Sequence, residues 1–293
     1  MADGNDVAEG EGLAGGAPPP QQEGFFDHRV SFINHAGDPS SPLEMVMPIG
    51  FFDPSNALFH PFGTGVFVSH VGLVCTARHV FQFEPRFLES MSHLSPDSYP
   101  AIYQFYDDHS AGVRPIIAVH GHPRFDVAVA RVEPVHHRTT GEAFSNKEMA
   151  LTTDVMPIGT RVHQYSYPDP VIFDQPEGPQ LLMIPLHTEG RIIDWLPKGM
   201  GSLFPSPCYV IEGYIGAGSS GGPVMDETGR VFAISSRGNA AADYYYAIPV
   251  QAIADIVISS VILSTPPVIA GPTIREMVTR GLVSFVERVD ESG

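Results

Sequence analysis

Short apolar segments separated by turn-forming residues constrain the fold of this chain more than any other feature. β-branched and aromatic residues favour strands, whereas Gly, Pro, Asp and Asn favour the turns between them. Segments rich in Val, Ile, Phe and Tyr lie at 45–52, 63–70, 71–77, 101–106, 114–120, 126–132, 208–215, 230–236 and 244–250. Regular short strands of this kind predict an all-β barrel or sandwich.

The two ends of the chain differ from this central region. Residues 1–24 carry five acidic and no basic side chains beside a Gly- and Pro-rich run, which predicts a disordered tail. Residues 251–263 have the length and apolar density of a helix. Thr273 and Glu276 form a capping box before an amphipathic pattern that reaches about Val289, so the segment 264–293 is expected to be a linker and a second helix. That helix packs on the domain or forms an interface.

Charge and composition exclude several classes of partner. The 16 basic and 33 acidic side chains give a net charge of −17, which disfavours nucleic acid and anionic membranes as partners. The chain lacks a run of about 18 apolar residues and the basic, apolar start of a secretory signal. The two cysteines, Cys75 and Cys208, are too few for a disulfide framework. We therefore expect a cytoplasmic protein.

The segment Gly218–Pro223, of sequence GSSGGP, is the strongest chemical signal. A serine nucleophile needs an exposed hydroxyl on a tight turn and backbone N–H groups that face the developing oxyanion. Glycines on both sides of Ser220 permit such a turn. A Gly- and Ser-rich hairpin turn is the alternative for these six residues taken alone.

Two further segments supply the partners that an activated serine requires. An apolar run ends at His79, and Asp126 opens another one. An imidazole can accept the serine proton, and a carboxylate can orient that imidazole. The close histidine pairs at 120 and 122 and at 136 and 137 lack the spacing of a zinc site, so we expect neither a metal nor a cofactor.

Together these segments resemble the trypsin/chymotrypsin-like serine peptidases, in which TA-x-H-V, D-[IVL]-A-[VL] and G-x-S-G-G-P carry the base, acid and nucleophile. The segments 63–68 (GTGVFV) and 246–249 (YAIP) resemble the bacterial HtrA/Deg branch, and 158–168 is a weaker echo of it. The resemblance implies that residues 25–263 form two six-stranded antiparallel β-barrels, with a boundary near 133–155 and a C-terminal helix. About 30 residues follow Leu263, too few for the PDZ domain of that branch.

The resemblance also implies further site residues. The N–H groups of Gly218 and Ser220 would form the oxyanion hole, and the strand containing Ser235, Ser236 and Arg237 would pair with the substrate backbone. The segment before the nucleophile would line the specificity pocket; it consists of Tyr214, Ile215, Gly216 and Ala217. Because this segment contains no acid, it favours a small or apolar P1 side chain. Arg237 would instead favour acidic side chains.

These observations predict a serine endopeptidase that acts on proteins or peptides through His79, Asp126 and Ser220, with an acyl-enzyme intermediate. Three alternatives to an active endopeptidase remain open. The first is a catalytically silent peptide-binding module. The second is an enzyme kept latent until a partner binds the tail or residues 273–289, and the third is an esterase that uses the same triad. Residues 273–289 could also contact another copy of the chain.

Overall fold

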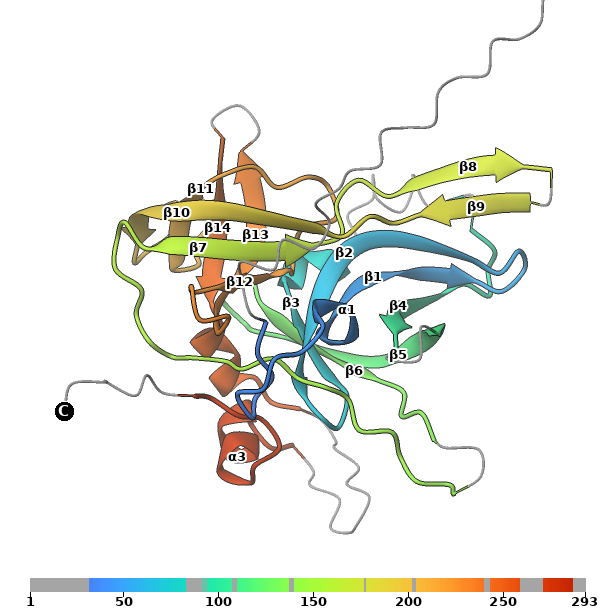
Figure 1. The fold of residues 1–293 in the computed structure, drawn as a ribbon, viewed down its shortest axis with the longest axis horizontal. Coiled ribbons are helices and arrows are strands. Elements are labelled where there is room, and N and C mark those ends of the chain that lie inside the picture. The colour runs from blue at the N-terminus through green and yellow to red at the C-terminus, as the bar shows by residue number, and fades with distance from the viewer. Residues whose placement is uncertain are drawn as a thin grey trace, which may run out of the picture.

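The computed structural model describes residues 32–82, 92, 94–106, 110–136, 140–176, 178–201, 204–239, 243–258 and 271–286. Two closed barrels of six antiparallel strands form the body of the molecule (Figure 1). The prediction of an all-β fold with two such barrels is therefore confirmed. Residues 1–24, expected to be a tail, lie outside the described residues.

The first barrel comprises the first six strands. The short helix α1 (Pro42–Met45) precedes them, and the 3₁₀ helix η1 (Arg78–Phe81) follows the third strand. The strands are β1 (Val46–Asp53), β2 (Leu58–Ser69), β3 (Leu73–Thr76), β4 (Tyr99–Phe105), β5 (Ala111–Gly121) and β6 (Ala128–Val132). Their order around the barrel is β1-β2-β3-β6-β5-β4, which places the end of β3 beside the start of β6.

Six strands from the remainder of the chain form the second barrel, in the order β10-β11-β14-β13-β12-β7. These are β7 (Arg161–Ser166), β10 (Leu186–Leu196), β11 (Cys208–Glu212), β12 (Pro223–Met225), β13 (Val231–Asn239) and β14 (Tyr244–Pro249). Between β7 and β10 the chain forms a two-stranded sheet of β8 (Val171–Gln175) and β9 (Gly178–Leu182), which projects beyond the barrel in Figure 1.

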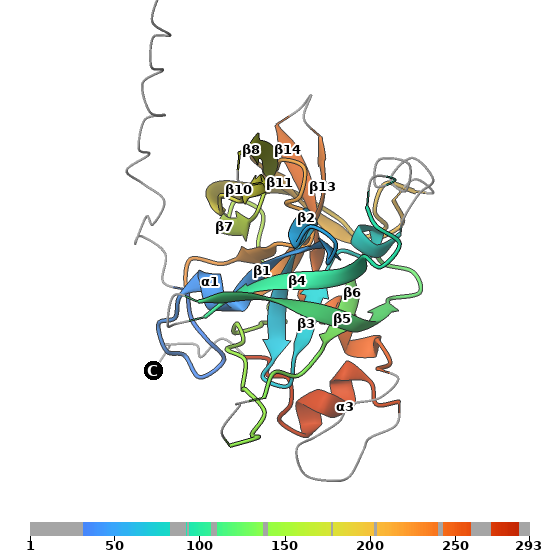
Figure 2. The ribbon, with the colours of Figure 1, turned by 90° about the vertical axis from the view of Figure 1, so that its right-hand side faces the viewer.

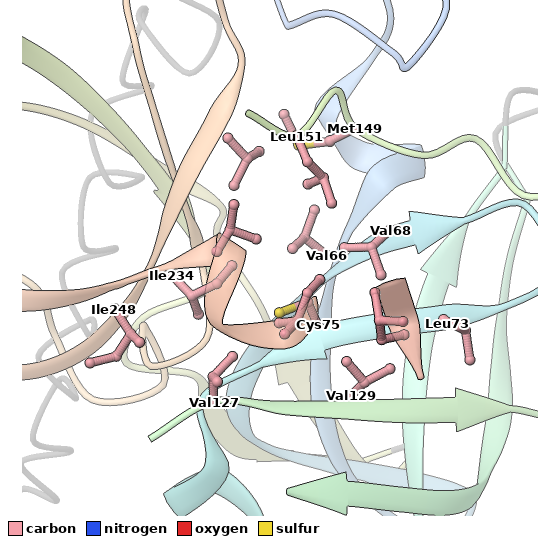
Figure 3. Packing of buried hydrophobic residues seen from close by; sticks show 14 of the residues in the cluster. Val66, Val68, Leu73, Cys75, Val127, Val129, Met149, Leu151, Ile234 and Ile248 are labelled. Atoms are coloured by element: carbon pink, nitrogen blue, oxygen red, sulfur yellow. The ribbon is translucent and has the colours of Figure 1, made fainter. Parts of the chain in front are cut away.

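A buried apolar cluster joins the two barrels. Side chains from β2, β3 and β6 meet Ile234 and Ile248 of the second barrel, together with Met149 and Leu151 of the connecting segment (Figure 3). Cys75 lies within this cluster, and burial raises the pKa of its thiol. Both cysteines are buried free thiols.

The helix expected over residues 251–263 is present only as a short 3₁₀ helix, and the prediction is wrong for residues 256–258. The 3₁₀ helix η3 (Val250–Asp255) ends at Ile256, which has extended backbone, and Val257 pairs with Thr273. β-branched residues favour such extended pairing over a helix. Residues 259–263 lie outside the described residues.

The capping box predicted for the last helix is confirmed, but the helix is shorter than expected. The Thr273 side chain accepts the N–H of Glu276, and α3 spans only Ile274–Thr279. Gly281 has φ +70°, a left-handed conformation that ends the helix. The helix was predicted to continue to Val289, and this prediction is wrong for residues 280–286, the last residues that the structure describes. Figure 2 shows α3 at the edge of the molecule opposite the β8–β9 sheet. Within the described residues, no helix is long and apolar enough to cross a membrane.

The segment that connects the barrels contains one buried and one exposed aliphatic side chain whose removal should affect stability differently. The side chain of Leu151 is fully buried in the cluster between the barrels, whereas Ile158 on the same connection is 63% exposed. Leu151→Ala should lower the free energy of unfolding by about 2–5 kcal/mol, because it leaves a cavity. Ile158→Ala should change it by less than about 0.5 kcal/mol. Urea denaturation measures both; equal effects would contradict this account of the joint.

A buried carboxyl on the same connection predicts a pH dependence. The Glu148 side chain is 2% exposed and lies 3.3 Å from His35 and 3.8 Å from His70. Burial raises its pKa to about 7 from an ordinary 4.5, against a smaller opposing effect of its hydrogen bond with the His70 backbone. Below pH 4.5 the carboxyl is protonated in both folded and unfolded chains, and stability is lost as the pH rises through 7.

Relative to Glu148→Gln, the wild-type chain should therefore lose about 2 kcal/mol of stability between pH 5 and pH 8. Urea midpoints of the two proteins at both pH values measure the difference. The glutamine variant serves as the control because its side chain does not titrate. Identical pH dependence in the two proteins would refute the burial cost assigned to Glu148.

Candidate active site

His79 lies on η1, directly after β3 leads the chain to the junction of the barrels. Its backbone N–H donates to Oδ1 of Asp126 over 2.9 Å, and its ring Nδ1 lies 2.7 Å from Oδ2. Because an ionised carboxylate only accepts hydrogen bonds, Nδ1 carries the proton and Nε2 keeps a free lone pair. The histidine is therefore held in the tautomer that can accept a proton at Nε2.

Asp126 precedes β6 and is held by groups from both barrels. Its backbone N–H donates to the Ser206 hydroxyl over 2.8 Å, and the Ser236 hydroxyl donates to its Oδ2. Burial raises the pKa of this carboxyl, but the hydrogen bonds from His79 and Ser236 and the charge of His79 outweigh that effect and lower it to about 2. The carboxylate therefore remains ionised at neutral pH.

Ser220 sits in a turn that only glycine neighbours permit. Gly218 and Gly221 have φ values of +91° and +94°, and a Cβ on Gly221 would lie 2.0 Å from the Thr64 carbonyl oxygen. The Ser220 hydroxyl donates to the Ser236 carbonyl over 2.7 Å. Within the described residues it makes no hydrogen bond with His79, so the histidine and aspartate are paired while the serine hydroxyl points elsewhere.

The peptide groups around Ser220 have a defined orientation. The Ala217 carbonyl accepts the N–H of Asp169 over 2.6 Å, and the Ser219 carbonyl accepts the Ser235 hydroxyl over 2.7 Å. In a trans peptide the following N–H points away from the carbonyl. The N–H groups of Gly218 and Ser220 therefore face away from these bonds, and neither has an acceptor among the described residues.

Thr64 of β2 fixes the same turn from the first barrel. Its N–H donates to the Ser220 carbonyl over 2.8 Å, and its hydroxyl donates to the Gly218 carbonyl over 2.8 Å. The Thr76 hydroxyl in turn donates to the Thr64 carbonyl over 2.7 Å. The turn that carries Ser220 is thus attached to the barrel that carries His79.

The residues expected in the specificity segment have different environments. Tyr214 is 52% exposed and Ala217 is exposed, whereas Ile215 and Gly216 are buried. A Cβ added to Gly238 would lie 3.0 Å from Cγ1 of Ile215, so the isoleucine packs against the end of β13.

The three residues expected to pair with substrate also differ from one another. The side chain of Ser235 is fully buried and bonds to the turn, and that of Ser236 bonds to Asp126. Arg237 is exposed, with its guanidinium carbon 5.9 Å from the centre of the Phe204 ring. Only Arg237 of the three projects its side chain to the surface.

In the described part of the chain, no three His, Cys, Asp or Glu side chains are arranged to hold a metal ion. The position of His122 has a structural explanation. Its ring stacks on Phe125 with centroids 4.3 Å apart, and its Nδ1 accepts the backbone N–H of Phe125 over 2.9 Å.

Sequence reasoning missed three contributions to the site. Thr64 and Ser206 lie far in sequence from the groups they bind, and no motif assigns either of them a contact with the site. The hydrogen bond of Ser236 to Asp126 was also not expected, because the resemblance suggested a role for its backbone alone. Ser206 carried no signal; the threonine of the segment 63–68 was visible only as part of a strand motif.

Solved structures offer comparisons at low similarity. A Deg5 crystal structure is 16% identical, with a TM-score of 0.47 over 71% of this chain and 84% of that chain. The active form of the Rv3671c protease from M. tuberculosis is 17% identical, with a TM-score of 0.47 over 83% and 92%. The HtrA-type protease AlgW with a tripeptide is 15% identical, with a TM-score of 0.45 over 71% and 57%.

No curated protein matches the sequence. The family model described as a trypsin-like peptidase domain matches residues 63–234. This range is more than half of the chain and includes the strand of Thr64, both members of the hydrogen-bonded His79–Asp126 pair, and the turn of Ser220. The chain therefore belongs to the family of trypsin-like peptidase domains.

Proposed function

We propose that the protein is a serine endopeptidase in which Ser220 is the nucleophile, His79 the general base and Asp126 the residue that orients His79. The observation that carries the proposal is the pairing of the ionised Asp126 carboxylate with Nδ1 of His79 at 2.7 Å. This pairing leaves Nε2 able to accept a proton and stabilises the imidazolium that results.

The reaction begins with a change in hydrogen bonding. Ser220 breaks its bond to the Ser236 carbonyl and donates to Nε2 of His79 as Oγ attacks the substrate carbonyl carbon. The N–H groups of Gly218 and Ser220 bind the negative oxygen. His79 then donates the proton to the leaving amine, which leaves an acyl group on Ser220. Water, deprotonated by His79, attacks the ester; as that intermediate collapses, the bond to Oγ breaks, His79 returns the proton to Oγ, and the acid is released.

Substrate backbone would bind along Ser236 to Gly238. β12 pairs with β13 only as far as Ile234, so Ser236 to Gly238 have no strand partner on the β12 side of β13. An extended peptide can add there by antiparallel hydrogen bonds. Ile215 packs against Gly238 and narrows the adjacent space, which supports the preference for a small or apolar P1 side chain. Arg237 is the exposed charge that would favour an acidic side chain elsewhere on the substrate.

A latent enzyme or a silent peptide-binding module is the second candidate. The bond from Ser220 to the Ser236 carbonyl favours it, because this carbonyl holds the hydroxyl away from His79. A partner bound to the N-terminal tail or to the region 273–289 would then release the serine.

Fluorophosphonate labelling tests for an activated serine without knowledge of the substrate. The wild-type chain should acquire one adduct on Ser220, whereas Ser220→Ala should acquire none. His79→Ala should react at least about a hundredfold more slowly, because the general base is lost. Intact-mass measurement followed by peptide mapping identifies the modified serine.

The neighbouring Ser219 provides an internal control, because its hydroxyl is buried and accepts that of Ser166 over 3.0 Å. An adduct on Ser219, or equal labelling of wild type and His79→Ala, would exclude the proposed catalytic roles. A folded wild-type chain that remains unlabelled would support the second candidate.

Ser236→Ala tests the support of Asp126. Loss of this hydrogen bond should slow labelling about tenfold, since a bond to a charged group contributes roughly 1.5 kcal/mol. It should also raise the pKa of Asp126, which the pH dependence of its carboxyl carbon-13 chemical shift measures. Ser236→Thr keeps the hydroxyl and should restore part of the rate. A slower rate with an unchanged carboxyl pKa would indicate a structural defect instead.

A further inference from the structure

A cavity of about 700 Å³ lies outside the proposed active site. The end of the second barrel forms one wall, and η3, α3 and the residue Phe285 form the other. Its volume falls within the range of small-molecule sites, roughly 300–1,000 Å³. The proposed reaction uses none of its lining residues.

The walls of the cavity are mainly apolar. The aromatic rings of Phe125, Trp195 and Phe285 are only partly buried and line it together with three prolines. Trp195 packs on Tyr209 with ring centroids 4.7 Å apart. Aromatic surface left open in a cavity of this size favours an apolar ligand body.

Two basic side chains lie at the cavity, Arg275 in its wall and Arg124 beside the ring of Phe125. Arg275 donates to Asp255 over 2.8 Å, and the Arg124 guanidinium lies 5.4 Å from the centre of the Phe125 ring. His122 is neutral, because its Nδ1 accepts the N–H groups of Arg124 and Phe125. The hydrogen bond from Arg275 lowers the pKa of Asp255 against the opposing effect of burial, and the charges of Arg275 and Arg124 lower it further.

Arg275 in the wall and Arg124 beside Phe125 both act electrostatically on the one carboxylate, Asp255, in a chain whose net charge is −17. Arg275 is 70% exposed and uses one of its donors on Asp255, so further donors remain for a ligand. This local charge is opposite in sign to that of the chain as a whole, and it is complementary to an anion.

We propose that this cavity is a binding site for a small amphipathic anion, whose apolar body lies between Phe125, Trp195 and Phe285 and whose acidic group binds Arg275. The chemical class is a carboxylic or similar acid with an apolar chain or ring.

The site is connected to the proposed catalytic aspartate. Phe125 and Pro207 line the cavity, and each is the immediate neighbour of a residue in the bond from the Asp126 N–H to the Ser206 hydroxyl. A ligand that packs on both neighbours restrains this bond and so the position of Asp126. This effect on catalysis rests on the proposed function, whereas binding itself does not.

Trp195 is the only tryptophan of the chain and reports occupancy by its fluorescence. The experiment titrates the full chain carrying Ser220→Ala with decanoate, below the concentration at which decanoate forms micelles, and with decanol as the neutral probe. Saturable change of the emission with decanoate, at least about tenfold tighter than with decanol, is the expected result. No saturable change, or equal affinity for the two probes, would overturn the proposal.

Arg275→Gln supplies the matched test of the charge. It should weaken decanoate binding about tenfold and leave decanol binding unchanged. Because both members of the Asp255–Arg275 pair are 70% exposed, its loss should leave the fold intact. Arg280→Gln removes an equal charge from the end of α3, outside the cavity, and should behave as the parent does. Equal weakening by both variants would show a long-range charge effect and refute the assigned contact.

The effect of ligand binding on the reactivity of Ser220 is measured in the chain that retains Ser220. Saturating decanoate should raise the fluorophosphonate labelling rate of the wild-type chain by at least about twofold, and Arg275→Gln should need about tenfold more decanoate for the same effect. Binding without any change in labelling would refute the coupling to Asp126. If the wild-type chain is never labelled, the proposed function fails, and the binding result with Ser220→Ala still decides the anion site.

Discussion

The hydrogen bonds from Thr64 to the turn of Ser220 are the constraint on which the rest of the site depends. His79 and Asp126 are positioned by the first barrel, whereas Ser220 belongs to the second. A reaction between them requires the two barrels to be in register to within a fraction of an ångström. Two bonds from one residue of β2 hold both the Gly218 and the Ser220 carbonyl, and the apolar cluster beneath them keeps the barrels together.

The site combines a preassembled pair with a serine that has to move. The ionised Asp126 carboxylate accepts hydrogen bonds from His79 and Ser236, and its backbone N–H donates to the Ser206 hydroxyl. The His79–Asp126 pair would therefore need no rearrangement in the proposed reaction. In the proposed reaction, the Ser220 hydroxyl would exchange one hydrogen bond for another as it turns from the Ser236 carbonyl to His79. Because a neutral hydrogen bond contributes only about 1 kcal/mol net, small changes in the surroundings can decide which bond prevails.

Local strand patterns predicted an all-β barrel or sandwich, and the three segments of the proposed triad carried the resemblance that implied two six-stranded barrels. The sequence did not predict β10 or β12. The first of these has many polar residues on its exposed face, and the second is only three residues long. The helix expected at 251–263 failed because Val257 finds a strand-like partner in Thr273. The contacts of Thr64 and Ser206 cross 154 and 80 residues, a separation at which one sequence carries no signal.

Direct capture of an acyl group on Ser220 tests the central claim. The full chain would be mixed with a peptide ester whose P1 residue is alanine, quenched in acid, and digested for mass spectrometry. The proposed chemistry predicts an acyl adduct on the peptide containing Ser220 in the wild-type chain, and none in His79→Ala. An ester that is hydrolysed equally by both proteins, or an adduct on any other residue, would contradict the roles assigned to Ser220 and His79.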